Sequence, residues 1–139
     1  MLSEHLNSFL CHLNVMARQI SSNHGLSLSQ YLTLNSISST GISMTDLSQR
    51  VGIDNSTLTR NINILIKKSL VTKEQSLTDA RGFTVELTKN GDNIVDLMEK
   101  EMNKIITRIG NDLDPKEREN LIEIISKLNW KLSCYFNEL

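Results

Sequence analysis

A helical segment that leads directly into a β-hairpin constrains this chain more than any other feature, and it occupies residues 53–87. Apolar side chains at Leu58, Ile62 and Leu65 follow the spacing of four and three that buries one face of a helix. The opposite face is then polar, with the side chains of Ser56, Thr59, Arg60 and Asn63. The spacing therefore predicts a helix with one packed face and one face free for polar contacts.

After Leu70 the pattern changes from helical spacing to an alternation of two, which is typical of β-strands. The alternation predicts two short strands, over residues 71–75 and 83–87. Between them, Asp79 can accept hydrogen bonds from nearby backbone amides, and Gly82 is free to take a positive φ. We therefore expect a hairpin whose loop projects Arg81 at its tip.

A further helix is predicted just upstream, because Met44, Leu47 and Val51 repeat at spacings of three and four. Ser43 can cap the start of this helix, and Gly52 can end it. Two helices joined by a turn that contains glycine form a helix-turn-helix, in which the first helix braces the second. With the hairpin added, the predicted fold is a winged helix-turn-helix that is mainly α with a small β-hairpin wing.

The chemistry of the exposed groups favours contact with double-stranded DNA. In a helix-turn-helix the second helix enters the major groove, where hydroxyls, amides and guanidinium groups meet base edges and phosphates. The predicted DNA-binding residues are Ser56, Thr57, Thr59, Arg60 and Asn63 on the helix, with Asp79 and Arg81 on the wing. The alternative is a winged-helix module that binds other proteins and not DNA.

The same residues carry a resemblance to a known family. They are residues 56–62 (STLTRNI), 70–71 (LV), 79–82 (DARG), 85–88 (VELT), Gly91, and residues 25–27 with Gln30 and Tyr31. This pattern resembles the multiple-antibiotic-resistance regulator (MarR) family over nearly the whole chain. One departure is Ser69, where many members carry a glycine, so the helix must end without a residue that enters the left-handed region freely.

The resemblance implies a transcriptional regulator, most often a repressor, that acts as a homodimer on a pseudo-palindromic operator. Its half-sites would lie about one helical turn apart. We expect one domain over residues 1–139, with a winged helix-turn-helix lobe at 27–91 and helical dimerisation regions at 1–24 and 92–139. No signal segment or membrane-spanning run is apparent, so we expect a cytoplasmic protein with no membrane partner.

Charge is distributed unevenly along a chain whose net charge is −1. Residues 43–90 hold seven basic and five acidic side chains, whereas residues 91–139 hold seven basic and ten acidic side chains. A net charge of +2 in the first segment and −3 in the second has the sign expected if the middle of the chain contacts phosphates. The acidic C-terminal part should then face away from DNA.

Apolar stripes at both ends of the chain predict the dimer contacts. The first stripe consists of Leu2, Leu6, Phe9, Leu10, Leu13, Met16 and Ile20. The second consists of Leu121, Ile124, Ile125, Leu128, Leu132, Tyr135, Phe136 and Leu139. The helix that carries the second stripe should begin at a capping box made by Asp114 and Glu117, with Pro115 in its first turn. Between the stripes, a long helix capped by Thr88 carries Ile94, Leu97, Met98, Ile105 and Ile109.

No set of residues suggests an enzyme, a metal site or a cofactor. His5, His12 and His24 lack a cysteine or carboxylate at ligand spacing, so polar or capping roles are favoured. Cys11 and Cys134 fit best as small buried side chains. A redox-sensing role for Cys11 stays open, because some members of the family sense peroxides through a cysteine on the first helix.

The resemblance also implies a crevice for a small phenolic or aromatic anion that changes DNA affinity. Its candidate lining is His12, Met16, Arg18 and Tyr31, with Arg18 as the cation that would meet a carboxylate. The other interpretation is that Met16 and Tyr31 belong to the core and that Arg18 is solvated. The sequence does not name the effector.

Overall fold

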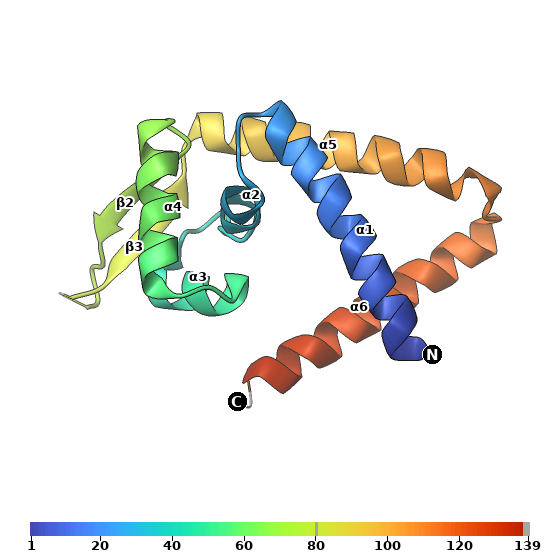
Figure 1. Ribbon diagram of the computed structural model, residues 1–139. Helices are drawn as coiled ribbons and strands as arrows, with labels where there is room; N and C mark the ends of the chain where they lie inside the picture. The colour runs from blue at the N-terminus through green and yellow to red at the C-terminus, as the bar shows by residue number, and fades with distance from the viewer. Residues whose placement is uncertain (80, 138–139) are drawn as a thin grey trace. The chain divides into compact units, whose positions relative to one another are not determined.

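The computed structural model describes residues 1–79 and 81–137, and it forms two compact units, Met1–Met102 and Asn103–Leu139 (Figure 1). Ala80 and Leu139, which the sequence pattern assigned to the wing turn and to the C-terminal stripe, lie outside the described residues.

The first unit contains most of the secondary structure. Its helices are α1 (Leu2–Asn23), α2 (Leu28–Asn35), α3 (Met44–Val51) and α4 (Asn55–Lys67), followed by the first part of α5 (Lys89–Ile109). Its strands are β1 (Ile42–Ser43), β2 (Val71–Gln75) and β3 (Phe83–Leu87). The predicted class, mainly α with a small hairpin wing, is confirmed.

The predicted helix-turn-helix is confirmed together with its signals for starting and stopping. The Ser43 hydroxyl accepts a hydrogen bond from the Asp46 amide at 3.0 Å, which caps the start of α3. Gly52 ends α3 in the left-handed region at φ +72°, a conformation that glycine adopts without a Cβ clash. Asp54 then caps α4, so the turn between the two helices is very short.

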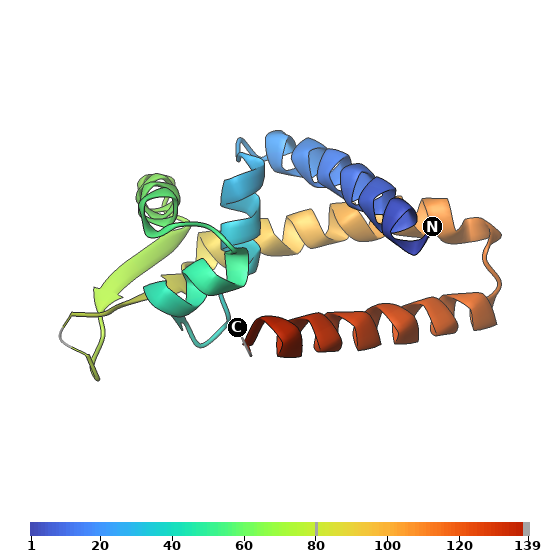
Figure 2. The same cartoon turned by 60° about the horizontal axis from the view of Figure 1, so that its bottom comes forward.

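The sheet has three antiparallel strands in the order β1-β3-β2. The hairpin pairs Val71 with Leu87 at its base and Gln75 with Phe83 near its tip, and it extends away from the helices of this unit (Figure 2). β1 adds a two-residue edge in which Ile42 pairs with Val85. The sequence predicted only the hairpin, because two residues are too few to show a period.

The junction of α4, the wing and α5 is closely packed. Ser69 adopts φ +59°, so a serine takes the left-handed position that ends α4, and the Leu70 amide bonds to the Leu65 carbonyl at 3.0 Å. Thr88 caps α5 by accepting from the Gly91 amide, as predicted, and it also donates to the Ser69 carbonyl at 2.6 Å. A Cβ on Gly91 would lie 2.0 Å from the Leu70 carbonyl oxygen, so only glycine fits there.

The core of the first unit lies beneath the inner face of α4. Side chains with less than 2% exposure include Leu34 on α2, Leu47 on α3, three residues of α4, and Val85 of the hairpin. The three residues of α4 are Leu58, Ile62 and Leu65, each fully buried. The apolar spacing in the sequence therefore identified the packed face of α4 correctly.

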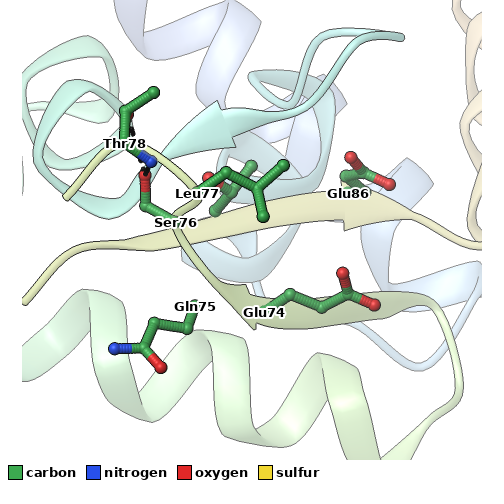
Figure 3. A pocket seen from close by; sticks show the side chains of 7 residues that line it. Glu74, Gln75, Ser76, Leu77, Thr78 and Glu86 are labelled. Carbon is green, nitrogen blue, oxygen red and sulfur yellow. Dashed lines mark hydrogen bonds between the residues drawn. The ribbon is translucent and has the colours of Figure 1, made fainter. Parts of the chain in front are cut away.

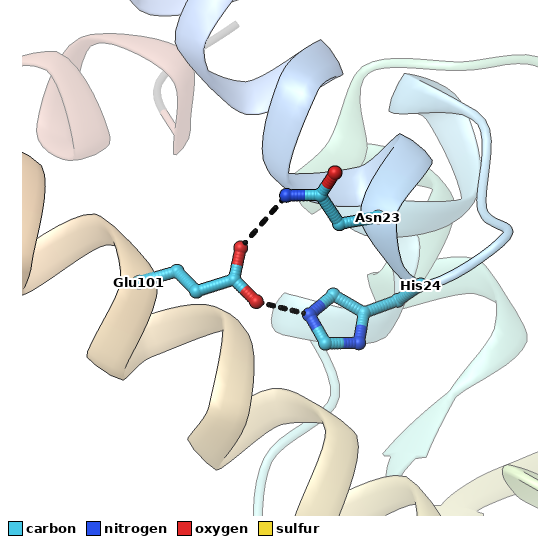
Figure 4. Close-up of polar contacts among 3 residues, drawn as sticks. All are labelled: Asn23, His24 and Glu101. Carbon is cyan, nitrogen blue, oxygen red and sulfur yellow. Dashed lines mark hydrogen bonds and ion pairs between the residues drawn. The ribbon is translucent and has the colours of Figure 1, made fainter.

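Helix α1 changes character along its length. Ala17 and Ile20 near its C-terminal end are buried, whereas Leu2, Leu6 and Phe9 are about half exposed or more. His24 follows the helix, and its Nε2 lies 2.7 Å from Oε1 of Glu101 on α5, while the Asn23 amide donates to the other oxygen at 3.2 Å (Figure 4). These contacts join the end of α1 to α5 within the first unit.

The second unit contains the end of α5, a short 3-10 turn η1 (Gly110–Asp112) and α6 (Pro115–Asn137). The predicted capping box is confirmed: Glu117 donates its amide to Asp114 Oδ1, and Asp114 donates its amide to Glu117 Oε2, both at 2.9 Å. No described residue of α6 is buried in the single chain. Across the described ranges, no helix is both long and apolar enough to span a bilayer.

Candidate nucleic-acid interface

The polar face of α4 is open to solvent. Ser56, Thr59, Arg60 and Asn63 are all exposed, on the side opposite the buried Leu58, Ile62 and Leu65. We call these four residues the reading face. Because the inner face of α4 is fully packed, the helix presents the reading face from a fixed support.

Thr57, which was also predicted to contact DNA, has a different environment. It is only partly exposed, and its hydroxyl donates to Asp54 Oδ2 at 2.7 Å while its backbone amide donates to Oδ1 at 2.8 Å. These two hydrogen bonds, the amide first, lower the pKa of the Asp54 carboxyl below its ordinary value. The Thr57 hydroxyl is therefore already bonded to the residue that caps α4. The position of Thr57 on the helical wheel did not indicate this bond.

The wing presents Arg81 as predicted. Arg81 is exposed, and its backbone amide donates to Asp79 Oδ1 at 3.0 Å, so Asp79 does order the turn through the backbone. Gly82, which is free to take a positive φ, does not enter the left-handed region. Its amide instead closes a turn onto the Asp79 carbonyl at 3.0 Å, and a Cβ there would lie 3.2 Å from Asp79 Oδ2.

A second cation, Lys73, lies on the wing, where the sequence pattern indicated no role for it. The Lys73 ammonium lies 4.5 Å from the centroid of the Phe83 ring, a cation–π contact across the hairpin. Lys73 pairs with Val85, so Phe83 is its diagonal neighbour on the same face of the sheet. The sequence predicted the two strands without a register, so it did not place Phe83 diagonally opposite Lys73.

The other face of the hairpin is acidic. A surface pocket of about 270 Å³ is lined by Glu74, Gln75, Ser76, Leu77, Thr78, Thr84 and Glu86. Figure 3 shows Glu74, Glu86 and the exposed Leu77 around it. Two carboxylates would repel a phosphate or an anionic ligand, so this face of the hairpin is unsuited to either.

The four candidate effector residues differ in exposure. Tyr31 is buried, with 6% of its surface exposed. His12, Met16 and Arg18 lie on α1 and are more exposed. None of the four lines the pocket on the wing. Tyr31 thus has the burial of a core residue, while Arg18 has that of a solvated charge.

Histidine and cysteine residues fall outside any clustered site. His24 has the polar and capping roles that the sequence favoured: its ring contacts Glu101, and its backbone amide caps the C-terminal end of α1. In the single chain Cys11 is exposed on the N-terminal half of α1 and Cys134 is half-buried, so their burial in the dimer stays a prediction. Within residues 1–79 and 81–137, no group of three or more potential ligands could hold a metal ion.

The fold is that of a winged helix-turn-helix protein. Two helices form the helix-turn-helix, the second has an exposed polar face, and a hairpin follows it immediately. A family model described as the MarR family matches residues 24–82. Over these residues the chain is similar to the MarR family of winged-helix transcriptional regulators. Members of this family are transcription regulators and not enzymes, which agrees with the sequence analysis.

Solved structures share this fold over nearly the whole chain. A MarR protein from Peptoclostridium difficile is 21% identical with a TM-score of 0.81, covering 99% of this chain and 90% of its own. The multiple antibiotic-resistance repressor of Listeria monocytogenes is 29% identical with a TM-score of 0.61, covering 95% and 94%. A point mutant of S. aureus MepR, bound to an oligodeoxyribonucleotide, is 17% identical with a TM-score of 0.65, covering 95% and 98%.

Proposed function

We propose that this protein is a homodimeric repressor that reads a specific sequence in double-stranded DNA. The observation that carries the proposal is the reading face of α4, which is exposed while the opposite face of the same helix is fully buried. A rigidly supported polar helix face, next to a wing with an exposed arginine, has the shape and chemistry that the major groove accepts.

Each side chain of the interface has a role that its chemistry suits. Arg60 can donate two hydrogen bonds to a guanine, and Asn63 can bond an adenine. The hydroxyls of Ser56, Thr57 and Thr59 suit base edges or the flanking phosphates, with Thr57 limited by its bond to Asp54. Arg81 reaches into the adjacent minor groove, and Asp79 holds the turn that carries it. Support comes from the point mutant of MepR, a structural relative that is bound to an oligodeoxyribonucleotide.

The homodimer follows from the apolar side chains that the single chain leaves exposed. On α6, Leu128 is 47% and Leu132 is 52% exposed, and on α1 Leu6 and Phe9 have similar values. Stripes of this kind mark association surfaces. In this proposal residues 27–91 contact DNA, and residues 1–24 and 92–139 hold two chains together. A two-fold dimer then reads a pseudo-palindromic operator with half-sites about one helical turn apart.

An effector is the finer part of the proposal. A small aromatic or phenolic anion would bind beside His12, Met16 and Tyr31, with Arg18 meeting its charge. Arg18 is exposed and can form a bidentate pair with a carboxylate. Salicylate is a suitable probe: it should weaken operator binding by the wild-type protein and have less effect on Arg18→Ala. Equal effects on both proteins would remove Arg18 from the site.

The DNA-reading proposal is tested by selection of bound fragments from a random duplex library, followed by affinity measurements on the selected sequence. Arg60→Ala and Asn63→Ala should each cost about 1–3 kcal/mol on that sequence and relax the preference at one position. Arg118→Ala, which removes the same charge from α6, is the matched control and should leave the preference unchanged.

Three outcomes would oppose the proposal. If both variants of α4 keep the affinity and preference of the wild type, the reading face is not the reader. Weak retention on random duplex that does not respond to salt would favour a winged-helix module that binds proteins.

A selected sequence placed at a promoter should lower reporter expression when the protein is present, and increased expression would identify an activator.

A further inference from the structure

The inner face of α4 contains one polar side chain among its buried residues. Asn61 is 5% exposed, and it lies between Arg60 of the reading face and the fully buried Ile62. Every other buried residue of α4 is leucine or isoleucine. A buried amide lowers stability unless it is hydrogen-bonded, so its partners identify what it does.

The partners of Asn61 lie on α2. Its Nδ2 donates to the Ser29 hydroxyl at 2.7 Å and to the Thr33 hydroxyl at 3.3 Å. Thr33 is completely buried, and its own hydroxyl donates to the Ser29 carbonyl at 2.7 Å. The three side chains therefore form a small polar network across the interface of α2 and α4, inside a core that is otherwise largely apolar.

The first turn of α2 is itself fixed by a capping box. The Ser27 hydroxyl accepts from the Gln30 amide, and the Gln30 side chain accepts from the Ser27 amide, both at 3.1 Å. Ser29 lies within this capped turn, so it offers Asn61 a well-ordered acceptor. The network thus connects α4 to a fixed point of the lobe.

Apolar contacts and hydrogen bonds constrain a helix differently. Leucine and isoleucine side chains can slide or rotate slightly while they remain buried, because dispersion attraction has little direction. A 2.7 Å hydrogen bond depends strongly on distance and angle, so it selects one rotation and one register of α4 against α2. A leucine at position 61 would bury more apolar surface but would select neither.

We propose that Asn61 is a positioning residue for DNA reading, which sets the rotation of α4 through Ser29 and Thr33 and thereby aims the reading face. The inference rests on the proposed function, since it concerns how accurately that face meets base edges. Asn61 itself contacts no DNA. Phosphate contacts tolerate small rotations better than base contacts do, so the network should affect discrimination more than overall affinity.

The test compares Asn61→Leu with the wild type on the selected duplex and on random duplex. The variant should keep the urea midpoint of the wild type within experimental error or raise it, and its affinity for random duplex should change less than about twofold. The ratio of selected to random affinity should fall about tenfold, the order of one misaligned base contact. Repeating the selection with the variant should give a more degenerate sequence.

Two further variants separate positioning from packing. Ser29→Ala removes the hydroxyl that accepts from Asn61 at 2.7 Å and changes the shape of the side chain little. It should lower the ratio of selected to random affinity by about threefold, which is less than the loss of one base contact. Combined with Asn61→Leu it should add nothing further, because the bond is already absent. Ile62→Val, a control in the same helix, should lower the urea midpoint and leave the ratio unchanged.

The inference fails if Asn61→Leu keeps the discrimination of the wild type, or if Ile62→Val lowers it equally. If Asn61→Leu does not fold, Ser29→Ala decides: an unchanged ratio overturns the inference and a lowered one supports it. A wild-type protein without any sequence preference would overturn the proposed function itself. Preference in the wild type that survives in both variants overturns only the positioning role.

Discussion

Helices α4 and α6 both carry an apolar stripe, but only one of them buries it within the chain. Leu58, Ile62 and Leu65 of α4 are fully buried, whereas Leu121, Leu128 and Leu132 of α6 are about half exposed. Apolar spacing therefore predicts which face of a helix is packed without saying whether the partner belongs to the same chain. The winged lobe completes its own core, and the stripe of α6 requires a second chain in the proposed dimer.

The largest expected effect is the loss of the dimer in Leu128→Asp. A carboxylate at the centre of the α6 stripe would be buried without a partner, which should cost about 3–5 kcal/mol and raise the dimer dissociation constant more than a hundredfold. Sedimentation at micromolar concentration should then show monomers. Ser126→Asp adds the same charge on the opposite face of α6 and should stay dimeric, so a dimeric Leu128→Asp protein would mean that the interface is elsewhere.

Truncation of the packed face of α4 should have the next largest effect. Leu58→Ala leaves a cavity in the core of the lobe and should lower the free energy of unfolding by about 2–5 kcal/mol in urea titrations. The matched change Leu121→Ala should cost less than about 1 kcal/mol when both are measured in the monomeric Leu128→Asp background. Equal losses at the two positions would remove the contrast between α4 and α6.

The wing supplies a smaller effect, on DNA binding alone. Arg81→Ala should weaken binding to selected and random duplex alike and reduce the salt dependence by up to about one unit of slope, since one phosphate-neutralising cation is lost. A protein with the affinity and slope of the wild type on both duplexes would show that the hairpin is only a structural cap.

Asp79→Ala distinguishes the effect of the Asp79 charge on DNA binding from its effect on the conformation of the wing turn. Loss of an acid near DNA would by itself tighten binding, so weaker binding would have to come from the loss of the bond to the Arg81 amide. We expect a weakening that is milder than that of Arg81→Ala, measured in the same salt titrations. Tighter binding would mean that the turn keeps its form without Asp79.

The smallest expected effect is a gain of stability in Ser69→Gly. The φ of +59° at Ser69 costs a residue with a Cβ about 1–2 kcal/mol, part of which glycine loses again through the greater freedom of its unfolded chain. A net gain of about 0.5–1 kcal/mol in the free energy of unfolding should result. The Thr88 bond to the Ser69 carbonyl involves only the backbone of residue 69 and should persist. A loss of stability would show that the serine side chain stabilises this turn.

Most of the fold could be predicted because its signals are local. Ser43, Asp114 and Thr88 cap their helices as the sequence indicated, and the spacing of the α4 leucines and isoleucines identified its buried face. Features that depend on distant segments were missed. β1 pairs with a strand far along the chain, and Asn61 bonds to side chains 32 and 28 residues earlier.

The candidate interface shows the same division. A helical wheel separated Arg60 and Asn63 from the core correctly, because exposure in a helix follows its period. It could not show that the Thr57 hydroxyl donates to Asp54, the capping residue of α4, nor that Lys73 lies over Phe83. Those contacts depend on rotamers and on strand register, which single positions in a sequence do not determine.

The contrast between the two regions is tested most directly by binding to duplexes with one or two half-sites. Wild-type protein should bind two half-sites spaced one helical turn apart at least about a hundredfold more tightly than one, because the second contact is then intramolecular. Leu128→Asp should keep the affinity for a single half-site and gain nothing comparable from the second. If the wild type gains nothing, or if Leu128→Asp gains as much as the wild type, α6 does not link two DNA-reading lobes.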